Sequence, residues 1–258
     1  MLITWEGSVH LLYFNISREY DGIFGLGFDW MSKIGKNISS QYSTFVDKAT
    51  FDLGLFNIFG LYLSLDGDDK KDGEIVIGGY DPCRIDGDSL VFRLTNSGKE
   101  KTLKWEIDLG EYQFGIGNSL LSIPSFESGN ALIDSGTTTI MLPDKDLVDE
   151  INQNLGAEWN SARGGYFFKD CTDARNGPDV TINFAKVQDS YQAHFSIPAK
   201  NYVMPVSALD CKSQIIYGSK IKDKIILGVP FLRSYYAVFD KEREQISLAK
   251  AKHSSICT

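Results

Sequence analysis

The segment Asp134-Ser135-Gly136-Thr137-Thr138 combines residue types that could carry out acid–base chemistry. It follows the apolar run 131–133, so it would place a carboxylate at the end of a buried strand. Gly136 allows the backbone to turn sharply there. Ser135 and the threonines can donate hydrogen bonds that hold the carboxylate. The pattern therefore predicts a positioned Asp134, although Asp, Ser and Gly also favour ordinary turns.

Other catalytic chemistries lack the residues they need. The histidines are His10, His194 and His253, and no G-x-S-x-G motif surrounds a serine, so serine hydrolase chemistry is not supported. No H-E-x-x-H or C-x-x-C pair is present to bind zinc. The stretch 25–27 lacks the third glycine of a dinucleotide-binding loop. We therefore expect neither a metal nor a cofactor.

Composition narrows the class of protein. The chain has 258 residues and a formal charge of −8, which argues against a nucleic-acid partner because phosphate binding needs a basic surface. No apolar run approaches the roughly 18 residues that a membrane-spanning helix needs. An aromatic content of 12% and 24 glycines favour a globular, sheet-rich fold with many turns.

Local patterns predict mostly strands and two helices. The runs 61–65 and 74–79 read as a hairpin, and 89–94 is expected to pair with 103–109. Helices are predicted over 144–151, ended by Gly156, and over 231–236 after Pro230. The remaining predicted strands are 130–133, 166–168, 180–184 and 192–197. The fold class is therefore mostly β.

A weak internal repeat indicates two related lobes. Residues 21–28 and 224–231 both read as an apolar strand that ends in Leu-Gly and leads into a helix-like stretch. The turn-rich stretch 81–87 is the best boundary between them. We expect one unit over 1–84 and another over 85–258.

Four motifs in one order carry a resemblance to a known family. Residues 133–138, together with 21–27, 105–109 and 226–240, closely resemble the pepsin-like aspartic proteases, and the likeness covers about 20–249. The resemblance implies a bilobal β fold, with a complete carboxyl lobe over 85–258 and a partial amino lobe over 1–84. It also implies a peptide or protein substrate and an endopeptidase activity that is highest in acid.

In that family each lobe supplies one Asp from an Asp-Thr/Ser-Gly motif, and a water molecule lies between the two. The resemblance assigns the carboxyl-lobe role to Asp134, with Ser135, Gly136, Thr137 and Thr138 as support. Two carboxyls about 3 Å apart share one proton, an effect for which the aspartic protease dyad is the standard example. One carboxyl activates the water and the other stabilises the oxyanion.

The sequence contains one such motif. The segments 52–54 and 108–110 have Asp and Gly but a Leu between them, which cannot donate to a carboxylate. The repeat spacing places the second motif about 70 residues before Met1. We consider a fragment of a longer precursor, a separate polypeptide, or a dimer that pairs Asp134 with Asp134, and favour the fragment. The alternative function is a catalytically inactive binding module on the same fold.

The cysteines and sequons bear on location. The resemblance implies a disulfide between Cys171 and Cys211, and we hypothesise a second one between Cys83 and Cys257. Glycosylation sequons begin at Asn15 and Asn37. Together with the resemblance, these features predict a secreted, vacuolar or lysosomal glycoprotein.

Overall fold

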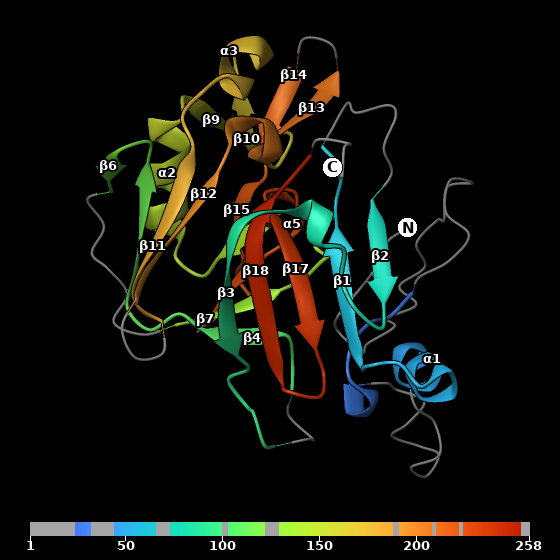
Figure 1. Cartoon of the computed structure of the whole chain (residues 1–258). Coiled ribbons are helices and arrows are strands. Elements are labelled where there is room, and N and C mark those ends of the chain that lie inside the picture. Colours follow the sequence, from blue (N-terminus) through green and yellow to red (C-terminus); the bar gives the residue numbers. More distant parts are fainter. Residues whose placement is uncertain are drawn as a thin grey trace.

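A computed structural model describes residues 24–31, 44–65, 73–99, 103–121, 129–187, 191–207, 210–221 and 224–253 (Figure 1). The helices, with η for a 3-10 helix, are η1 (Asp29–Met31), α1 (Phe45–Leu53), η2 (Pro82–Arg84), α2 (Lys145–Asn154), α3 (Cys171–Arg175), α4 (Ala199–Tyr202) and α5 (Val229–Leu232). The strands are β1 (Ile58–Tyr62), β2 (Glu74–Ile77), β3 (Ile85–Arg93), β4 (Glu106–Asp108), β5 (Tyr112–Ile116), β6 (Ser119–Leu120), β7 (Asn130–Ile133), β8 (Ile140–Leu142), β9 (Ala157–Asn160), β10 (Gly165–Phe168), β11 (Val180–Val187), β12 (Tyr191–Ile197), β13 (Val203–Ser207), β14 (Asp210–Ser213), β15 (Ile215–Tyr217), β16 (Lys224–Leu227), β17 (Tyr235–Asp240) and β18 (Gln245–Ala251). The predicted mostly β class is confirmed.

A five-stranded antiparallel sheet combines strands from residues 58–93 with strands from residues 235–251. Its order is β2-β1-β17-β18-β3, and Figure 1 shows β17 and β18 between β1 and β3. Phe59 of β1 stacks on Phe239 of β17, and both side chains are fully buried. The sheet therefore contains strands from both sides of residue 84. The lobe boundary expected at that residue stays a prediction.

Two further sheets are antiparallel and are formed by strands that lie between residues 112 and 213. Their orders are β13-β14-β10-β9 and β12-β11-β5-β6. Phe195 on β12 lies at the centre of an aromatic cluster and contacts Phe184, Phe231 and Tyr235 edge to face. Aromatic rings bury large apolar areas and prefer such edge contacts, so this cluster fastens β12 to α5 and β17.

The fourth sheet is mixed and carries the segment of chemical interest. Its order is β15-β8-β16-β7-β4, with β7 parallel to β16. Both strands are short and apolar, and residues 131–133 and 225–227 are buried, as expected for parallel strands covered on both faces. Because the carboxyl ends of parallel strands lie at the same edge, Asp134 and Gly228 follow side by side.

A buried ionic contact joins the opposite ends of the same strands. Glu106 is 6% exposed and accepts a hydrogen bond of 2.9 Å from the Asn130 amide. Its second oxygen pairs with Lys224. Asn130 opens β7 and Lys224 opens β16, so one carboxylate from β4 holds the starts of both strands.

A polar cluster fastens α1 to the turn between β17 and β18. Lys241 Nζ lies 2.6 and 2.8 Å from the two oxygens of Asp47 and 3.1 Å from Thr44 Oγ1. Asp29 accepts a hydrogen bond of 2.9 Å from the Thr44 amide. Partial desolvation of its carboxyl and a hydrogen bond with Asp47 raise the pKa of Asp29 from 3.8 to about 6. Burial opposes ionisation of Asp47, but the bond with Asp29 and the Lys241 ammonium lower its pKa well below the usual range.

Most predicted elements are confirmed. The runs 61–65 and 74–79 overlap the antiparallel pair β1–β2, and the predicted strands at 130–133, 166–168, 180–184 and 192–197 are β7, β10, β11 and β12. The helix predicted over 144–151 is α2, and its cap residue Asp144 accepts a hydrogen bond of 3.0 Å from the Leu147 backbone amide. Gly156 follows this helix with a φ of 80°, a conformation that glycine adopts without steric cost.

Two predictions are wrong. The run 89–94 does not form a hairpin with 103–109: β3 pairs along β18, and only one bridge, from Leu94 to Ile107, joins the predicted pair. Residues 231–236 do not form one helix, because α5 already ends at Leu232 and β17 begins at Tyr235. In both cases pairing with strands distant in sequence overrides the local pattern.

The repeat segment near residue 24 is only partly as expected. Residues 24–28 form no strand, and the 3-10 helix η1 follows them. The Trp105 indole donates a hydrogen bond of 3.1 Å to the Leu26 carbonyl, and its ring lies 4.6 Å from that of Phe28. This segment is therefore anchored on the residue that precedes β4.

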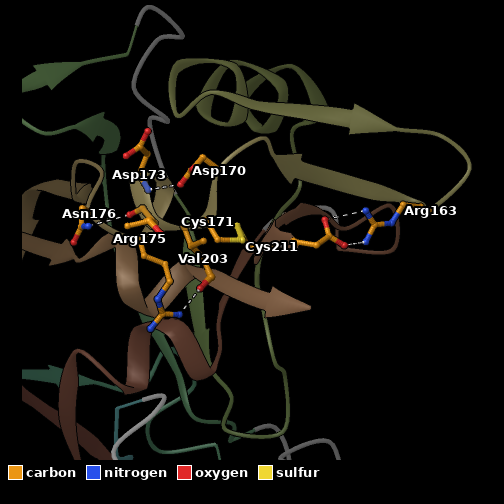
Figure 2. The surroundings of a disulfide bond; sticks show 10 residues. Arg163, Asp170, Cys171, Asp173, Arg175, Asn176, Val203 and Cys211 are labelled. Atoms are coloured by element: carbon orange, nitrogen blue, oxygen red, sulfur yellow. Dashed lines mark hydrogen bonds and ion pairs between the residues drawn. A yellow bond between two sulfur atoms is a disulfide. The ribbon is translucent and has the colours of Figure 1, made fainter. Parts of the chain in front are cut away.

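The disulfide implied by the resemblance is confirmed. Cys171 at the start of α3 bonds to Cys211 on β14 (Figure 2). The Asp170 carboxylate caps α3 by accepting a hydrogen bond of 2.9 Å from the Asp173 amide. The Arg163 guanidinium pairs with Asp210, next to Cys211. Asn15, Asn37 and Cys257 lie outside the described residues, so the two glycosylation sites and the bond from Cys83 stay predictions.

Among the described helices, none is both long and apolar enough to cross a membrane.

Candidate active site

Asp134 is the first residue after β7 and is 7% exposed. Its backbone amide donates a hydrogen bond of 3.1 Å to the Leu227 carbonyl, the last residue of β16. The residue therefore leaves the sheet at the edge where two parallel, buried strands end. The apolar run that precedes it explains this position, because residues 131–133 are all buried.

Both carboxylate oxygens of Asp134 are held by its own motif. Oδ1 accepts a hydrogen bond of 2.9 Å from the Gly136 amide. Oδ2 accepts one of 2.6 Å from the Thr137 hydroxyl. Two donors on two oxygens fix the plane of the carboxylate, so the group is oriented before any ligand arrives.

Gly228 packs directly against the backbone of this motif. A Cβ atom at residue 228 would lie 2.2 Å from the Thr137 carbonyl oxygen and 2.4 Å from that of Thr139. The Val229 amide donates a hydrogen bond of 2.9 Å to the same Thr137 carbonyl. The loop that carries Asp134 therefore rests on the start of α5, at a distance that only glycine permits.

The remaining predicted support residues lie where the motif places them, with different contacts. Ser135 is buried at 8% exposure, directly after Asp134. Thr138 is exposed, and its backbone carbonyl accepts a hydrogen bond of 2.7 Å from the Gln214 side chain. The Thr139 hydroxyl is buried without a hydrogen-bond partner in the part of the chain that the structure describes.

Gln214 is a contact that the sequence did not reveal. It lies 76 positions from Thr138, between the strand of Cys211 and the apolar pair 215–216. A single glutamine between two short strands gives no periodic signal. The polar residue next to an apolar run is the only hint that its side chain has a buried partner.

The segment 108–110 provides an internal comparison. Asp108 Oδ1 accepts a hydrogen bond of 2.8 Å from the Gly110 amide, the same turn that Asp134 makes with Gly136. Leu109 between them is fully buried, and Asp108 itself is exposed. The turn alone therefore does not produce a buried carboxylate, and the hydroxyl of Thr137 and the cover of Gly228 distinguish Asp134.

Within the described ranges, no three His, Cys, Asp or Glu side chains gather as metal ligands. The expectation that the protein uses neither metal nor cofactor stays a prediction.

The sequence model of the family described as "Eukaryotic aspartyl protease" matches residues 9–251. The chain belongs to the eukaryotic aspartyl protease family. The resemblance to pepsin-like proteases is thereby confirmed.

Three relatives illustrate the similarity within the aspartyl proteases. Probable vacuolar protease A of Arthroderma benhamiae is 30% identical over 242 residues, which cover 91% of this chain and 53% of the relative. Vacuolar aspartic protease of Candida albicans is 28% identical, with 91% and 51% covered. Cathepsin E of Rattus norvegicus is 26% identical, with 92% and 55% covered. The chain spans about half the length of the curated relatives it matches.

Proposed function

We propose that the protein is an aspartic endopeptidase and that Asp134 is one of its two catalytic aspartates. The observation that carries the proposal is the arrangement of this carboxylate: it is buried, and Gly136 and Thr137 donate to its two oxygens. A carboxylate oriented in this way can accept a proton from a water molecule without reorganising. Family membership supports the same reaction.

The reaction needs a second carboxyl, which a further Asp-Ser/Thr-Gly motif would supply. The sequence holds one such motif, and the second carboxyl would come from a longer form of the protein, from another polypeptide, or from Asp134 of a second copy in a symmetric dimer. With both in place, the pair holds a single proton. The ionised member takes a proton from the attacking water, and the protonated member donates to the developing oxyanion. Because one proton must stay on the pair, cleavage is expected in acid.

The relatives support two further parts of the proposal. The names of several contain "vacuolar", so a vacuolar, lysosomal or secreted location is proposed for this protein. Residues 1–84 would belong to the amino lobe and 85–258 to the carboxyl lobe, with a peptide or protein substrate bound between the lobes.

The test is peptide cleavage by the protein expressed from its complete coding sequence, measured between about pH 3 and pH 7. Asp134→Asn keeps the size of the side chain and the hydrogen bonds to its remaining oxygen, but it removes the proton acceptor. We expect the cleavage rate to fall by about 10²- to 10⁴-fold, the usual contribution of a general acid or base. Asp108→Asn is the matched control, because Asp108 makes the same turn at an exposed position.

Two outcomes would overturn the proposal. Undiminished cleavage in Asp134→Asn would remove the role of this carboxylate. A folded wild-type protein that binds peptides without cleaving any of them in acid would instead favour the inactive binding module.

A further inference from the structure

A buried amide links the loop of Asp134 to a distant part of the carboxyl side. Gln214 is 4% exposed and lies between β14 and β15. Its Nε2 donates a hydrogen bond of 2.7 Å to the Thr138 carbonyl and lies 3.6 Å from Met204 Sδ. The Gln214 amide is a side-chain donor to the Thr138 carbonyl, so its loss would remove the contact that ties this peptide to the segment between β14 and β15.

The backbone of Gln214 is equally constrained. Its backbone amide donates a hydrogen bond of 2.8 Å to the Tyr202 carbonyl. Its backbone carbonyl accepts one of 2.7 Å from the Ile140 amide at the start of β8. The side chain therefore projects from a fixed main chain. Because its own backbone is fixed, this donor cannot shift with the loop, and it holds the Thr138 peptide in one orientation.

The Thr138 carbonyl is one peptide away from the residue that touches the carboxylate. The Thr137 hydroxyl donates a hydrogen bond of 2.6 Å to Asp134 Oδ2, and the Thr137 carbonyl accepts one of 2.9 Å from the Val229 amide. Two consecutive carbonyls, those of Thr137 and Thr138, are thus held by donors on different elements. Fixing both peptide planes fixes the backbone angles of Thr138 and limits rotation about Thr137.

We infer that Gln214 is a positioning residue for Asp134, acting through Thr138 and Thr137. The inference rests on the proposed catalytic function of Asp134. It requires no contact between Gln214 and substrate. A purely structural role would stabilise the fold without changing the rate or its pH dependence, and the two roles therefore give different measurements.

The experiment replaces Gln214 in the full-length protein and follows both folding and catalysis. Gln214→Met has a similar shape and no donor. We expect its kcat to fall about 10- to 100-fold at an unchanged KM, as for a misplacement of the reacting group by up to about 1 Å. Gln214→Glu can donate to the Thr138 carbonyl only while it is protonated. Its activity should approach the wild-type value while the introduced carboxyl is protonated and fall below it as the pH rises through the pKa of that carboxyl, which burial raises above the ordinary glutamic acid value of about 4.3.

Asn152 provides the matched control. It is fully buried, and its side-chain amide donates hydrogen bonds of 2.8 Å to the Val148 carbonyl and 3.1 Å to the Ile215 carbonyl. Ile215 is the residue that follows Gln214 in the chain. It makes no contact with the Asp134 loop in these bonds. Asn152→Asp should lower the unfolding temperature and leave the shape of the pH–activity curve of the folded enzyme unchanged.

The inference is overturned if Gln214→Glu follows the wild-type pH–activity curve, or if folded Gln214→Met retains the wild-type kcat. Where Gln214→Met does not fold, Gln214→Glu in acid decides the question. Asp134→Asn, measured alongside, separates the two proposals. If Asp134→Asn is inactive while the Gln214 variants keep wild-type activity, only the positioning role is rejected. If Asp134→Asn itself keeps its activity, the proposed function is rejected.

Discussion

Gly228→Ala should damage both the stability of the protein and the position of Asp134. The φ of Gly228 is −90°, which any residue can adopt, so the constraint is space and not backbone conformation. An added Cβ would lie 2.2 Å and 2.4 Å from the carbonyl oxygens of Thr137 and Thr139. Ordinary contacts begin above about 3 Å. Since the obstacles are backbone atoms, no side-chain rotation relieves them.

The magnitude follows from what must move. Overpacking of this kind costs about 1–3 kcal/mol. A shift of the Thr137 carbonyl by about 1 Å also weakens its 2.9 Å bond from the Val229 amide, worth about 1 kcal/mol. We therefore expect a loss of about 2–4 kcal/mol in the free energy of unfolding. At about 2–4 °C for each kcal/mol, the unfolding temperature should fall on the order of 10 °C.

The assay combines thermal unfolding, followed by circular dichroism, with peptide cleavage at temperatures where the variant is folded. Cleavage should fall about 100-fold, because the shift carries the Thr137 hydroxyl away from Asp134. Gly79→Ala is the control, since a Cβ at Gly79 would meet nothing within 4 Å and its φ lies outside the glycine-specific region. Equal unfolding temperatures and equal activities in the two variants would refute the argument.

Two further predictions concern stability. The pKa of Asp29 is raised to about 6, so its contribution to stability is full below about pH 4 and is lost as the pH rises through 6. Such a shift in a buried group would correspond to about 3 kcal/mol, but Asp29 is exposed and solvent screening reduces our expectation to about 1 kcal/mol. Between pH 4.5 and pH 7, the free energy of unfolding measured in urea should fall less for Asp29→Asn than for wild type or for the exposed control Asp52→Asn. An identical fall in all three proteins would contradict the raised pKa of Asp29. The disulfide between Cys171 and Cys211 spans a separation of 40 residues, for which the chain-entropy model gives about 4 kcal/mol. Replacement of both cysteines by Ser should lower the urea midpoint accordingly, and an unchanged midpoint would show that the bond contributes little.

The fold was predictable where the signal is local. The apolar run before Asp134, the antiparallel pair β1–β2 and the helix that begins after Asp144 all follow from signals that lie close together in the chain. Such segments carry their own period, turn residues or cap. The pairing of β3 with β18 was not predictable in this way, because the two strands lie far apart in the chain and meet only in the folded sheet.

The stretch after Pro230 shows why local pattern failed there. Residues 231–236 follow Pro230 and are apolar except for Arg233 and Ser234, a pattern that is typical of a helix start. The helix ends after one turn because Tyr235 and Tyr236 pair with Lys250 and Ala249 of β18. The gain from burying β17 between β1 and β18 exceeds the small local preference for helix.

By itself, the sequence determined which residue types could carry the chemistry. The motif at 134–138, the order of the flanking motifs and the absence of other catalytic signatures led to the aspartic protease family, and the comparison confirmed it. A carboxylate followed by a glycine and hydroxyl residues is a local property, so it can be read from the chain.

Only the tertiary structure decided what makes Asp134 differ from Asp108. Both carboxylates accept a hydrogen bond from the glycine amide two residues later. Asp134 alone of the two lies buried beside Gly228, with Gln214 holding the next turn of its loop. Those contacts come from residues more than 70 positions away in the chain, and close packing brings them together only when the parallel strands have formed.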